Sequence, residues 1–357
     1  MTHIIVIGGG IAGLSAAAAL SRHAQVTVLE AEDALGYHST GRSAALIEQN
    51  YGAPPVQALN RASFGPLDDG GYLSPRGLLI VGRDFEKDAF DRDMHTMGTA
   101  PISIPEACGM VPILDPGKIA FAGYHAEAFD IDTDRLLQDF ARQLRANGSA
   151  IHTTTRVERI TRSQGRWQVI TSQAVFSADK LVNAAGAWSD EVADMAGVAP
   201  MGITPYRRSM ARIPAPDGHN VSGWPMFFGV GETWYAKPDA GALLISPADE
   251  DPVTAHDAWA EDLTLAEGLA RYSEVVSTEV TRLLSSWAGL RSFAPDRSLV
   301  LGPDPEMPDF IWCAGQGGYG IQTSFAAGQL VADLTFGHRT DLPEAAVAAL
   351  RPDRLRK

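Results

Sequence analysis

The sequence is poor in cysteine and lacks long apolar stretches. Its 357 residues include two cysteines, Cys108 and Cys313, which stand far apart and form no Cys-x-x-Cys or Cys/His spacing. A disulfide framework and a structural zinc site are therefore excluded, and we expect no metal. No run of about 18 or more residues is apolar enough to cross a bilayer, so we expect no integral membrane segment.

Basic residues are also scarce relative to acidic ones. The chain has 29 Lys and Arg against 43 Asp and Glu, which gives a net charge of −14. A surface with this balance repels phosphate backbones and disfavours nucleic acid as a partner. Met1-Thr2-His3 leads directly into an apolar run, without the basic region or the cleavage site of a secretory signal. We therefore expect a cytoplasmic protein, with peripheral contact to a membrane left open.

The composition is that of a large globular protein. Hydrophobic residues make up 45% of the chain and charged residues 20%. The length exceeds the roughly 100–150 residues of one ordinary core, which predicts one large domain or two interleaved ones. We find no linker, low-complexity tract or internal repeat that would separate two parts.

The first thirty residues predict a strand, a helix and a second strand. The run 4–7 is β-branched, as is typical of a strand buried on both faces of a parallel sheet. The segment 14–22 is rich in Ala and Leu and favours a helix, and 25–29 has the pattern of another strand. This order is that of a βαβ unit.

Three glycines and an acid give this unit a more specific meaning. Gly8 permits a tight turn, Gly10 lets a pyrophosphate approach the backbone, and Gly13 allows close packing of helix and strand. The helix start offers unpaired N–H groups and a partial positive charge. Glu30 follows the second strand, where it would accept hydrogen bonds from an adenosine ribose. The pattern predicts a dinucleotide site.

After this unit the sequence does not continue with the alternating strands and helices of an NAD-binding domain. This favours FAD over NAD as the dinucleotide. Residues 36–45 are small and polar and suit a segment that lies along a bulky cofactor. The alternation resumes near Ile131 with one helix and three strands, predicted at 133–147, 150–154, 167–171 and 180–186. The last of these strands ends in Ala-Ala-Gly, which looks like a second dinucleotide fingerprint of flavoproteins.

The rest of the chain adds a second type of pattern. The segments 204–213 and 233–247 contain strand-like stretches with Gly and Pro turns, and 262–284 is expected to be a helix. Near the end, a strand from Phe310 leads into a glycine loop and a helix through Leu334. A helix start aimed at the pyrimidine edge of a flavin would stabilise the anionic reduced ring.

Together these segments resemble the D-amino-acid oxidase superfamily of flavoproteins, which includes glycine oxidase, sarcosine oxidase and D-amino-acid dehydrogenases. Within it the chain is most similar to the D-arginine dehydrogenase type. The resemblance rests on 36–45, 130–134, 182–188, 237–241, 287–293 and 316–324. It implies an α/β fold in which a Rossmann-like FAD-binding domain is interleaved with an α+β substrate domain on a mixed sheet. The implied boundaries are 1–46, 131–204 and 286–357 for the first domain, and 47–130 and 205–285 for the second.

The resemblance also implies the reaction. We expect oxidative deamination of a D-amino acid, in which a hydride passes from Cα to flavin N5 and the resulting imino acid hydrolyses to a 2-keto acid and ammonia. FAD is expected to be non-covalent, with His38 in polar contact only. The electron acceptor, whether oxygen, a quinone or another compound, is left open. The expected cofactor-binding residues are Gly8, Gly10, Ala12, Gly13, Glu30, Ala31, Ser39, Thr40, Gly41, Arg42, Ser43, Ala44, Ala45, Val157, Ala185, Gly186, Gly317, Tyr319, Gly320, Ile321 and Gln322.

Oxidation of an amino acid requires an anchored carboxylate, which a pair of guanidinium groups can hold in a fixed orientation. The candidates are Arg291 and one of Arg207 and Arg208. Neighbouring residues of a strand face opposite ways, so only one of the latter two can point inward. The resemblance selects Arg208.

Three further contacts come from the resemblance. It assigns the hydroxyls of Tyr51 and Tyr235 to the substrate carboxylate and the carbonyl of Gly318 to the substrate amine. No side-chain general base stands out in the sequence. Cys313, within a buried strand, is expected to serve only in packing.

The pocket for the substrate side chain departs from the D-arginine type. That type has a histidine and an acid where this chain has Leu46 and Leu78. Met226 and Phe228 are expected on the same wall, whereas Glu48 would restore a negative charge. Loss of a carboxylate–guanidinium contact costs roughly 1.5–3 kcal/mol. This predicts that neutral or hydrophobic D-amino acids are preferred over D-arginine.

Three alternatives share much of this pattern. The same clamp would serve oxidation of a secondary amino acid such as sarcosine or proline. A 2-hydroxy-acid dehydrogenase shares the fold. A non-catalytic FAD-binding component of a complex would bind the flavin without turnover, but the paired arginines argue against it.

Overall fold

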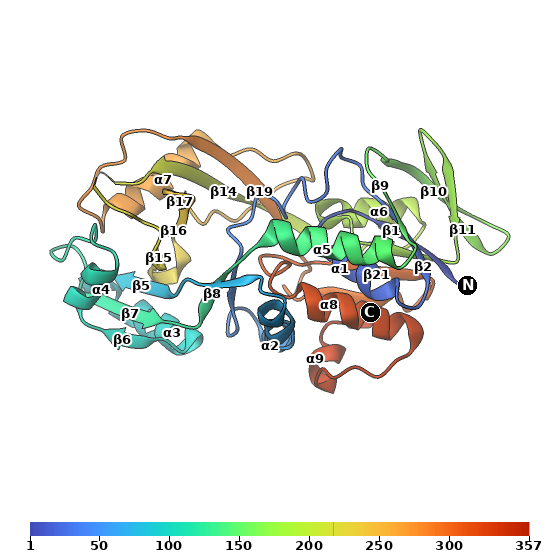
Figure 1. The fold of residues 1–357 in the computed structure, drawn as a ribbon, viewed down its shortest axis with the longest axis horizontal. Helices are drawn as coiled ribbons and strands as arrows, with labels where there is room; N and C mark the ends of the chain where they lie inside the picture. The colour runs from blue at the N-terminus through green and yellow to red at the C-terminus, as the bar shows by residue number, and fades with distance from the viewer. Residues whose placement is uncertain (217, 357) are drawn as a thin grey trace.

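Four sheets organise the molecule, whose computed structural model describes residues 1–216 and 218–356. A six-stranded and a nine-stranded sheet occupy two parts that lie side by side, as Figure 1 shows. Two three-stranded sheets complete the set. The α/β class predicted from the sequence is confirmed.

The six-stranded sheet has the order β20-β21-β13-β1-β2-β9. Four of its five neighbouring pairs are parallel, and β20 pairs antiparallel with β21. Its strands are β1 (His3–Ile7), β2 (Gln25–Leu29), β9 (Ala150–His152), β13 (Lys180–Asn183), β20 (Val300–Pro303) and β21 (Phe310–Ala314). Because β2 and β13 flank β1 on opposite sides, the carboxyl end of β1 lies where the strand order reverses, the usual ligand position in such sheets.

Side chains of β1 alternate between the two faces of this sheet. Ile4 and Val6 pack in one buried cluster with α1 (Ile11–Leu20), α5 (Thr133–Ala146) and α8 (Ser324–Phe336). Ile5 and Ile7 pack in another cluster against a three-stranded antiparallel sheet. The strands of that sheet are β10 (Val157–Ser163), β11 (Arg166–Thr171) and β12 (Val175–Ala178).

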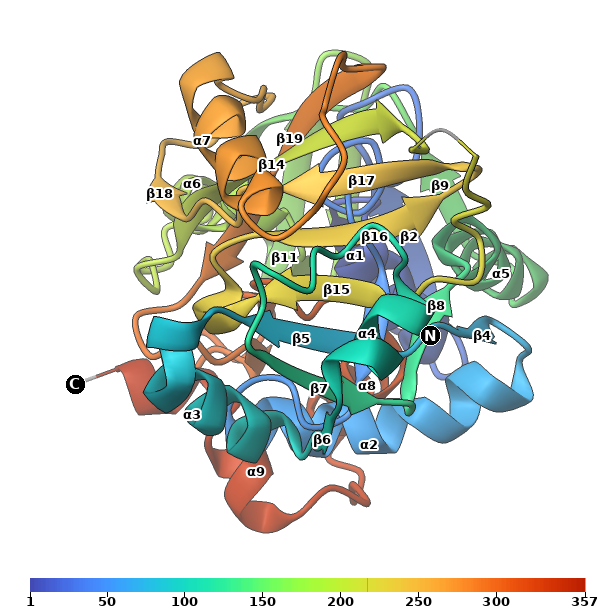
Figure 2. The same ribbon diagram turned by 90° about the vertical axis from the view of Figure 1, so that its left-hand side faces the viewer.

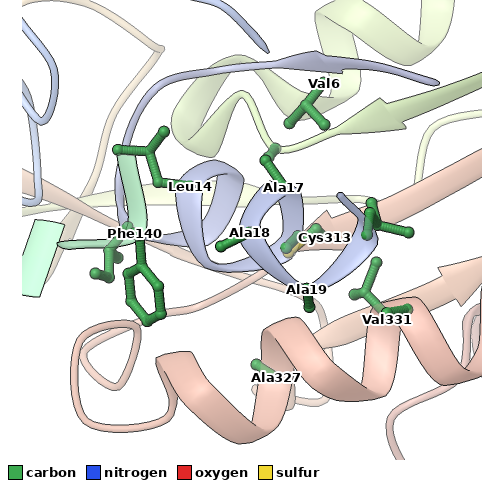
Figure 3. Packing of buried hydrophobic residues seen from close by; sticks show 14 of the residues in the cluster. Val6, Leu14, Ala17, Ala18, Ala19, Phe140, Cys313, Ala327 and Val331 are labelled. Atoms are coloured by element: carbon green, nitrogen blue, oxygen red, sulfur yellow. The ribbon is translucent and has the colours of Figure 1, made fainter. Parts of the chain in front are cut away.

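Helices α1 and α8 approach closely because small side chains line their contact (Figure 3). Ala16 to Ala19 of α1 and Ala327 of α8 are buried. At Gly328, a Cβ would lie 2.6 Å from the backbone carbonyl of Ser15, so glycine is required there. Cys313 is fully buried in the same cluster, and burial raises its pKa to about 12, in agreement with a packing role.

The nine-stranded sheet has the order β18-β14-β17-β16-β15-β5-β7-β6, with β19 also paired to β14 (Figure 2). Strands β5 and β15 pair in parallel and the other pairs are antiparallel. The strands are β5 (Leu78–Gly82), β6 (Ala100–Ile102), β7 (Phe121–His125), β14 (Thr204–Pro214), β15 (Met226–Gly229), β16 (Tyr235–Asp239), β17 (Ala242–Ser246), β18 (Asp251–Pro252) and β19 (Ser285–Phe293).

A small antiparallel sheet lies between the two large ones. Its order is β3 (Leu46–Glu48), β8 (Ala128–Ile131) and β4 (Leu73–Pro75). The remaining α-helices are α2 (Pro54–Asp69), α3 (Lys87–Met97), α4 (Ile104–Met110), α6 (Ser189–Met195), α7 (Asp262–Ser273) and α9 (Glu344–Ala348). Short 3-10 helices cover Asp84–Glu86, Gly186–Trp188, Val230–Glu232 and Pro352–Leu355. In the described part of the chain, every helix is too short or too polar to cross a membrane.

One sequence expectation is corrected. The helix predicted over 262–284 ends at Ser273, because Val275 and Val276 are β-branched and buried and the latter pairs with Leu114. The segment 286–293 lies within β19 and pairs with β14 of the nine-stranded sheet, and the domain boundaries given above stay a prediction.

The contact between α1 and α8 gives a prediction with a matched control. Gly328→Ala should lower the free energy of unfolding by about 2 kcal/mol, because the added methyl meets fixed backbone atoms. Gly109, near the end of α4, is exposed and has free space around it. Gly109→Ala should therefore raise the free energy of unfolding by about 0.5–1 kcal/mol. Chemical denaturation of the FAD-loaded proteins measures both; equal effects would contradict the close contact.

Candidate active site

Two glycines of the turn after β1 are required by the backbone itself. Gly8 has φ +110°, and a Cβ there would lie 2.3 Å from the carbonyl oxygen of Ala184. A Cβ on Gly13 would lie 1.9 Å from the carbonyl oxygen of Gly8. These contacts bring α1, β1 and the end of β13 together, as the sequence predicted for a tight turn and close packing.

Gly10 has a different explanation. Its φ of −80° and ψ of −176° suit any residue, and the nearest atom to an added Cβ is Thr40 Oγ1 at 3.2 Å. The backbone therefore does not demand glycine at this position. What a side chain would occupy is the space in front of the N-terminus of α1, where Gly10 lines a cavity. An anion would be stabilised there by the free N–H groups and the helix dipole.

Glu30 lies beside the same turn. Its Oε2 accepts a hydrogen bond from the Gly9 N–H at 2.6 Å, and its Oε1 accepts one from the Glu32 N–H at 2.9 Å. Each carboxylate oxygen has a second lone pair, which leaves acceptors for a ribose hydroxyl. The carboxylate is thus fixed in orientation by its own loop.

The first cavity runs from Glu30 past the turn to the glycine loop after β21. His38 lies in its wall, with Nε2 3.1 Å from Glu32 Oε1 and its ring 4.7 Å from the Trp188 ring. Eleven of the residues predicted to bind the cofactor line this cavity: Gly8, Gly10, Ala12, Glu30, Ala31, Ser39, Thr40, Val157, Ala185, Gly186 and Gly317.

A second cavity shares three chain segments with the first. In two of these segments, residues that line the first cavity are followed by residues that line the second: 36–40 by 43–46, and 316–317 by Gly318, Ile321 and Gln322. In the third segment, Leu290 and Ser292 of the first cavity alternate with Arg291 of the second. Because successive side chains of β19 point to opposite faces, Leu290 and Ser292 line the first cavity and Arg291 lines the second. A long ligand in the first cavity would therefore have one end at the wall of the second.

The second cavity contains all the residues predicted to contact substrate. It encloses about 800 Å³, open solvent at its mouth included. Its lining includes Tyr51, Arg208, Tyr235, Arg291 and Gly318, together with Leu46, Glu48, Leu78, Met226 and Phe228. Five residues predicted to bind cofactor also line it, namely Ser43, Ala44, Ala45, Ile321 and Gln322.

Strand alternation separates Arg207 from Arg208. Arg207 is buried with carboxylates: its Nε lies 3.2 Å from Asp249, its Nη2 lies 2.8 Å from Asp251, and its Nη1 pairs with Glu261. Arg208 faces the second cavity instead, with a side chain only 10% exposed. Its Nε and Nη1 are buried and meet no hydrogen-bond acceptor in residues 1–216 and 218–356.

Arg208 and Arg291 lie on the same face of the paired strands. In the register of β14 and β19, Tyr206 stands opposite Arg291 and Arg208 stands opposite Gly289, two residues further along. The two arginines are therefore diagonal neighbours. A Cβ on Gly318 would lie 3.0 Å from Arg291 Cζ, which explains why glycine is needed where this guanidinium passes. The pair can receive one anion from two sides.

Hydroxyl groups and one carboxylate surround Arg291. Burial alone would lower the pKa of Arg291, but Tyr51, Tyr235 and Glu232 raise it above its usual value, so the guanidinium stays charged. Burial also raises the pKa of Tyr51, which keeps its hydroxyl protonated. That hydroxyl donates to Glu232 Oε2 at 3.3 Å.

Sequence reasoning missed Glu232 and Met97, which also line the second cavity. Glu232 has φ +51°, an unusual backbone conformation for a residue with a side chain. It follows Gly231 three residues before Tyr235, and this proximity to a predicted contact was the available signal. Met97 closes α3 and carries no local pattern that marks a site.

Five predicted cofactor residues lie outside both linings: Gly13, Gly41, Arg42, Tyr319 and Gly320. Arg42 shows why: its Nη1 donates to the carbonyls of Ala258 and Ala288, and its Nη2 pairs with Asp257 at 2.5 Å. The guanidinium thus ties the loop around Asp257 to the segment that lines the cofactor cavity. We find no cluster of three or more His, Cys, Asp or Glu side chains arranged for a metal in the described residues.

Comparison with known proteins identifies the family. Residues 3–334 match the family described as "FAD dependent oxidoreductase" (DAO). The chain belongs to this family. FAD, predicted from the sequence, is therefore confirmed as the cofactor, and a glycine-lined cavity ending at a helix N-terminus fits its pyrophosphate.

Several members of this family are similar along nearly the whole chain. Sarcosine oxidase subunit beta from Rhizobium meliloti (strain 1021) is 24% identical over 384 residues, which cover 99% of this chain and 88% of that protein. The crystal structure of L-proline dehydrogenase from P. horikoshii superposes with a TM-score of 0.84 at 24% identity and covers 99% of this chain and 97% of its own. Glycine oxidase from Geobacillus kaustophilus gives 0.83 at 22% identity, with 97% and 98% covered. At these identities the structural likeness establishes the fold.

The backbone freedom at Gly10 gives a prediction about FAD. Gly10→Val should fold, because its φ and ψ suit any residue, but its side chain would fill the space of the pyrophosphate. We expect the Kd of the apoprotein for FAD to rise by tenfold or more, which corresponds to about 1.4 kcal/mol. Quenching of flavin fluorescence measures the Kd, and circular dichroism of the apoprotein checks the fold. A folded variant with unchanged FAD affinity would contradict this placement of the pyrophosphate.

Proposed function

We propose that the protein catalyses FAD-dependent oxidative deamination of a D-amino acid. The observation that carries this proposal is the pair Arg208 and Arg291, which lie on one face of β14 and β19 in a cavity that adjoins the cofactor cavity. Arg208 is only weakly paired, since Glu250 Oε1 lies 3.9 Å from its Nη2. The carboxylate of an amino acid would give both guanidinium groups a close acceptor. The membership of the DAO family supports redox chemistry at this position.

The residues of the chain have distinct tasks in this proposal. Arg208 and Arg291 hold the substrate carboxylate, and the Tyr235 hydroxyl donates to it. The Tyr51 hydroxyl, which donates to Glu232 in this structure, turns to the carboxylate when substrate is bound. The Gly318 carbonyl accepts a hydrogen bond from the amine. With these contacts made, Cα–H is oriented toward the wall shared with the cofactor cavity. FAD, when bound, supplies the hydride acceptor.

Tyr51 is not proposed as a base. Burial raises its pKa, so it acts as a hydrogen-bond donor at neutral pH. The substrate amine must be neutral when the hydride leaves, and its proton passes to solvent or to an ordered water. The imino acid that results hydrolyses to a 2-keto acid and ammonia.

We propose a neutral or hydrophobic substrate side chain. Leu78 and Phe228 are buried in the second cavity, and Leu46, Met97 and Met226 extend this apolar wall. Burying a guanidinium against such a wall without full pairing is costly. D-Arginine should therefore be a poor substrate.

Oxidation of a secondary amino acid is the second candidate. It is favoured by the similarity to sarcosine oxidase subunit beta and to L-proline dehydrogenase. The carboxylate clamp would serve such a substrate equally well, and only the amine and its substituent would differ.

Anaerobic reduction of the flavin tests the proposal. Mixed with D-leucine, D-methionine or D-phenylalanine, the yellow protein should bleach at least tenfold faster than with the L-enantiomers or with D-arginine. Sarcosine and L-proline are included as secondary amines. Bleaching by these two and not by the D-amino acids would select the second candidate, and no bleaching by any of them would refute amino-acid oxidation.

Arg207 and Arg208, which are adjacent in the sequence, provide a matched pair of variants. Arg208→Met should lower kcat/KM by about tenfold to a hundredfold, because a charge-assisted hydrogen bond contributes roughly 1.5–3 kcal/mol. Its stability and FAD content should be retained. Arg207→Met should instead lower stability by about 3 kcal/mol, since it removes the positive charge beside the buried Asp249 carboxylate and leaves it only the donors of Ser209. A loss of stability in Arg208→Met together with a loss of kcat/KM alone in Arg207→Met would contradict the proposed role of Arg208.

A further inference from the structure

Glu48 places a buried carboxylate in the second cavity. The residue is 4% exposed and lies on β3, two residues after Leu46. Both residues line the cavity, whereas Ile47 between them packs in the core next to α1 and α8. Alternation along the strand therefore directs the Glu48 side chain to the cavity face.

One oxygen of this carboxylate is satisfied and the other is not. Oε1 accepts a hydrogen bond from the Asn50 N–H at 3.0 Å, and His125 Nε2 lies 3.4 Å from it. Oε2 is fully buried and has no hydrogen-bond partner in the part of the chain that the structure describes. A buried acceptor left without a donor carries a free-energy penalty, so such an atom in a cavity indicates that a ligand donates to it.

The Glu48 carboxylate lies beside the part of the cavity wall that the residue types predict to be apolar. His125 stands opposite Leu78 in the register of β5 and β7, and Glu48 contacts this histidine. Glu48 thus supplies, from β3, a polar atom beside the apolar residue of β5. The cavity combines an apolar wall with one unpaired acceptor.

The surroundings of Glu48 suit a neutral donor better than a cation. His125 Nε2 lies 3.4 Å from the satisfied oxygen, and the wall beside the unpaired oxygen includes the apolar Leu46 and Leu78. A hydroxyl or carboxamide would meet the acceptor without bringing a full charge into the apolar wall.

We propose that Glu48 Oε2 accepts a hydrogen bond from the substrate side chain. The preferred substrates are then D-amino acids in which a short apolar stem ends in a neutral N–H or O–H donor. This inference rests on the proposed function and narrows its substrate class. Glu48 acts here as a determinant of specificity and takes no part in the redox step.

Pairs of substrates with nearly equal shape isolate the hydrogen bond. D-Asparagine is compared with D-leucine, and D-glutamine with D-methionine, by their kcat/KM values. In the wild-type protein, the substrate with the donor side chain should have the higher kcat/KM in at least one pair. In Glu48→Leu the preference in that pair should fall about tenfold or more, while turnover of the apolar partner is kept.

Two further variants separate this role from a general effect on the pocket. Glu48→Gln keeps an acceptor of the same size and should retain most of the preference. Leu46→Met changes the shape of the same strand face and leaves the acceptor in place, so the ratio within the pair should stay. FAD content and flavin spectrum report whether each variant is folded.

The outcomes distinguish the two levels of the proposal. If no D-amino acid reduces the flavin of the wild-type protein, the proposed function fails and the inference fails with it. If D-leucine is oxidised but neither pair shows a preference for the donor, the inference alone is overturned. It is also overturned if Glu48→Leu leaves the preferred ratio unchanged. Should Glu48→Leu not fold, Glu48→Ala takes its place. A ratio that Glu48→Gln and Leu46→Met retain but Glu48→Ala loses supports the inference, and an unchanged ratio in Glu48→Ala refutes it.

Discussion

The antiparallel pairing of β14 with β19 is the constraint on which the site depends. Its register places Arg208 and Arg291 on one face, as diagonal neighbours, and Arg207 on the other. Arg207 is neutralised by three acidic side chains, whereas two nitrogens of Arg208 are buried and have no partner among the described residues. The third nitrogen of Arg208, Nη2, lies 3.9 Å from Glu250 Oε1, which is too far for a hydrogen bond. The charge of this guanidinium is therefore only partly compensated, and the fold holds in place a site that an anionic ligand would stabilise.

The position of this pair matters because β19 also borders the cofactor cavity. Leu290 and Ser292 line that cavity, and Arg291 between them lines the other. A shift of one residue in the register of β19 would exchange these faces and remove the arginine from the substrate side. In the proposed function, the same nine-residue strand would therefore set the spacing between a carboxylate held by the two arginines and a flavin in the first cavity.

The sequence predicted the parts of the molecule that depend on local rules. The turn around Gly8 and Gly13 follows from steric contacts within one βαβ unit, and the choice between Arg207 and Arg208 follows from strand alternation with the aid of the resemblance. Other features depend on contacts between distant segments. The end of α7 is set by pairing near Leu114, and Glu232 enters the site only through a turn beside Tyr51. Neither contact leaves a periodic pattern in the chain.

The character of the substrate pocket illustrates the same division. Residue types at Leu46, Leu78, Met226 and Phe228 predict an apolar wall, and the structure brings all four into one cavity. The sequence placed Glu48 in this pocket as well, but it did not show that one of its oxygens would lack a partner, because that depends on contacts with distant segments such as His125. An apolar wall determines the shape of the side chain that enters. A single unpaired acceptor in it selects among side chains of that shape, since an apolar group would leave the acceptor unsatisfied and a matching donor would not.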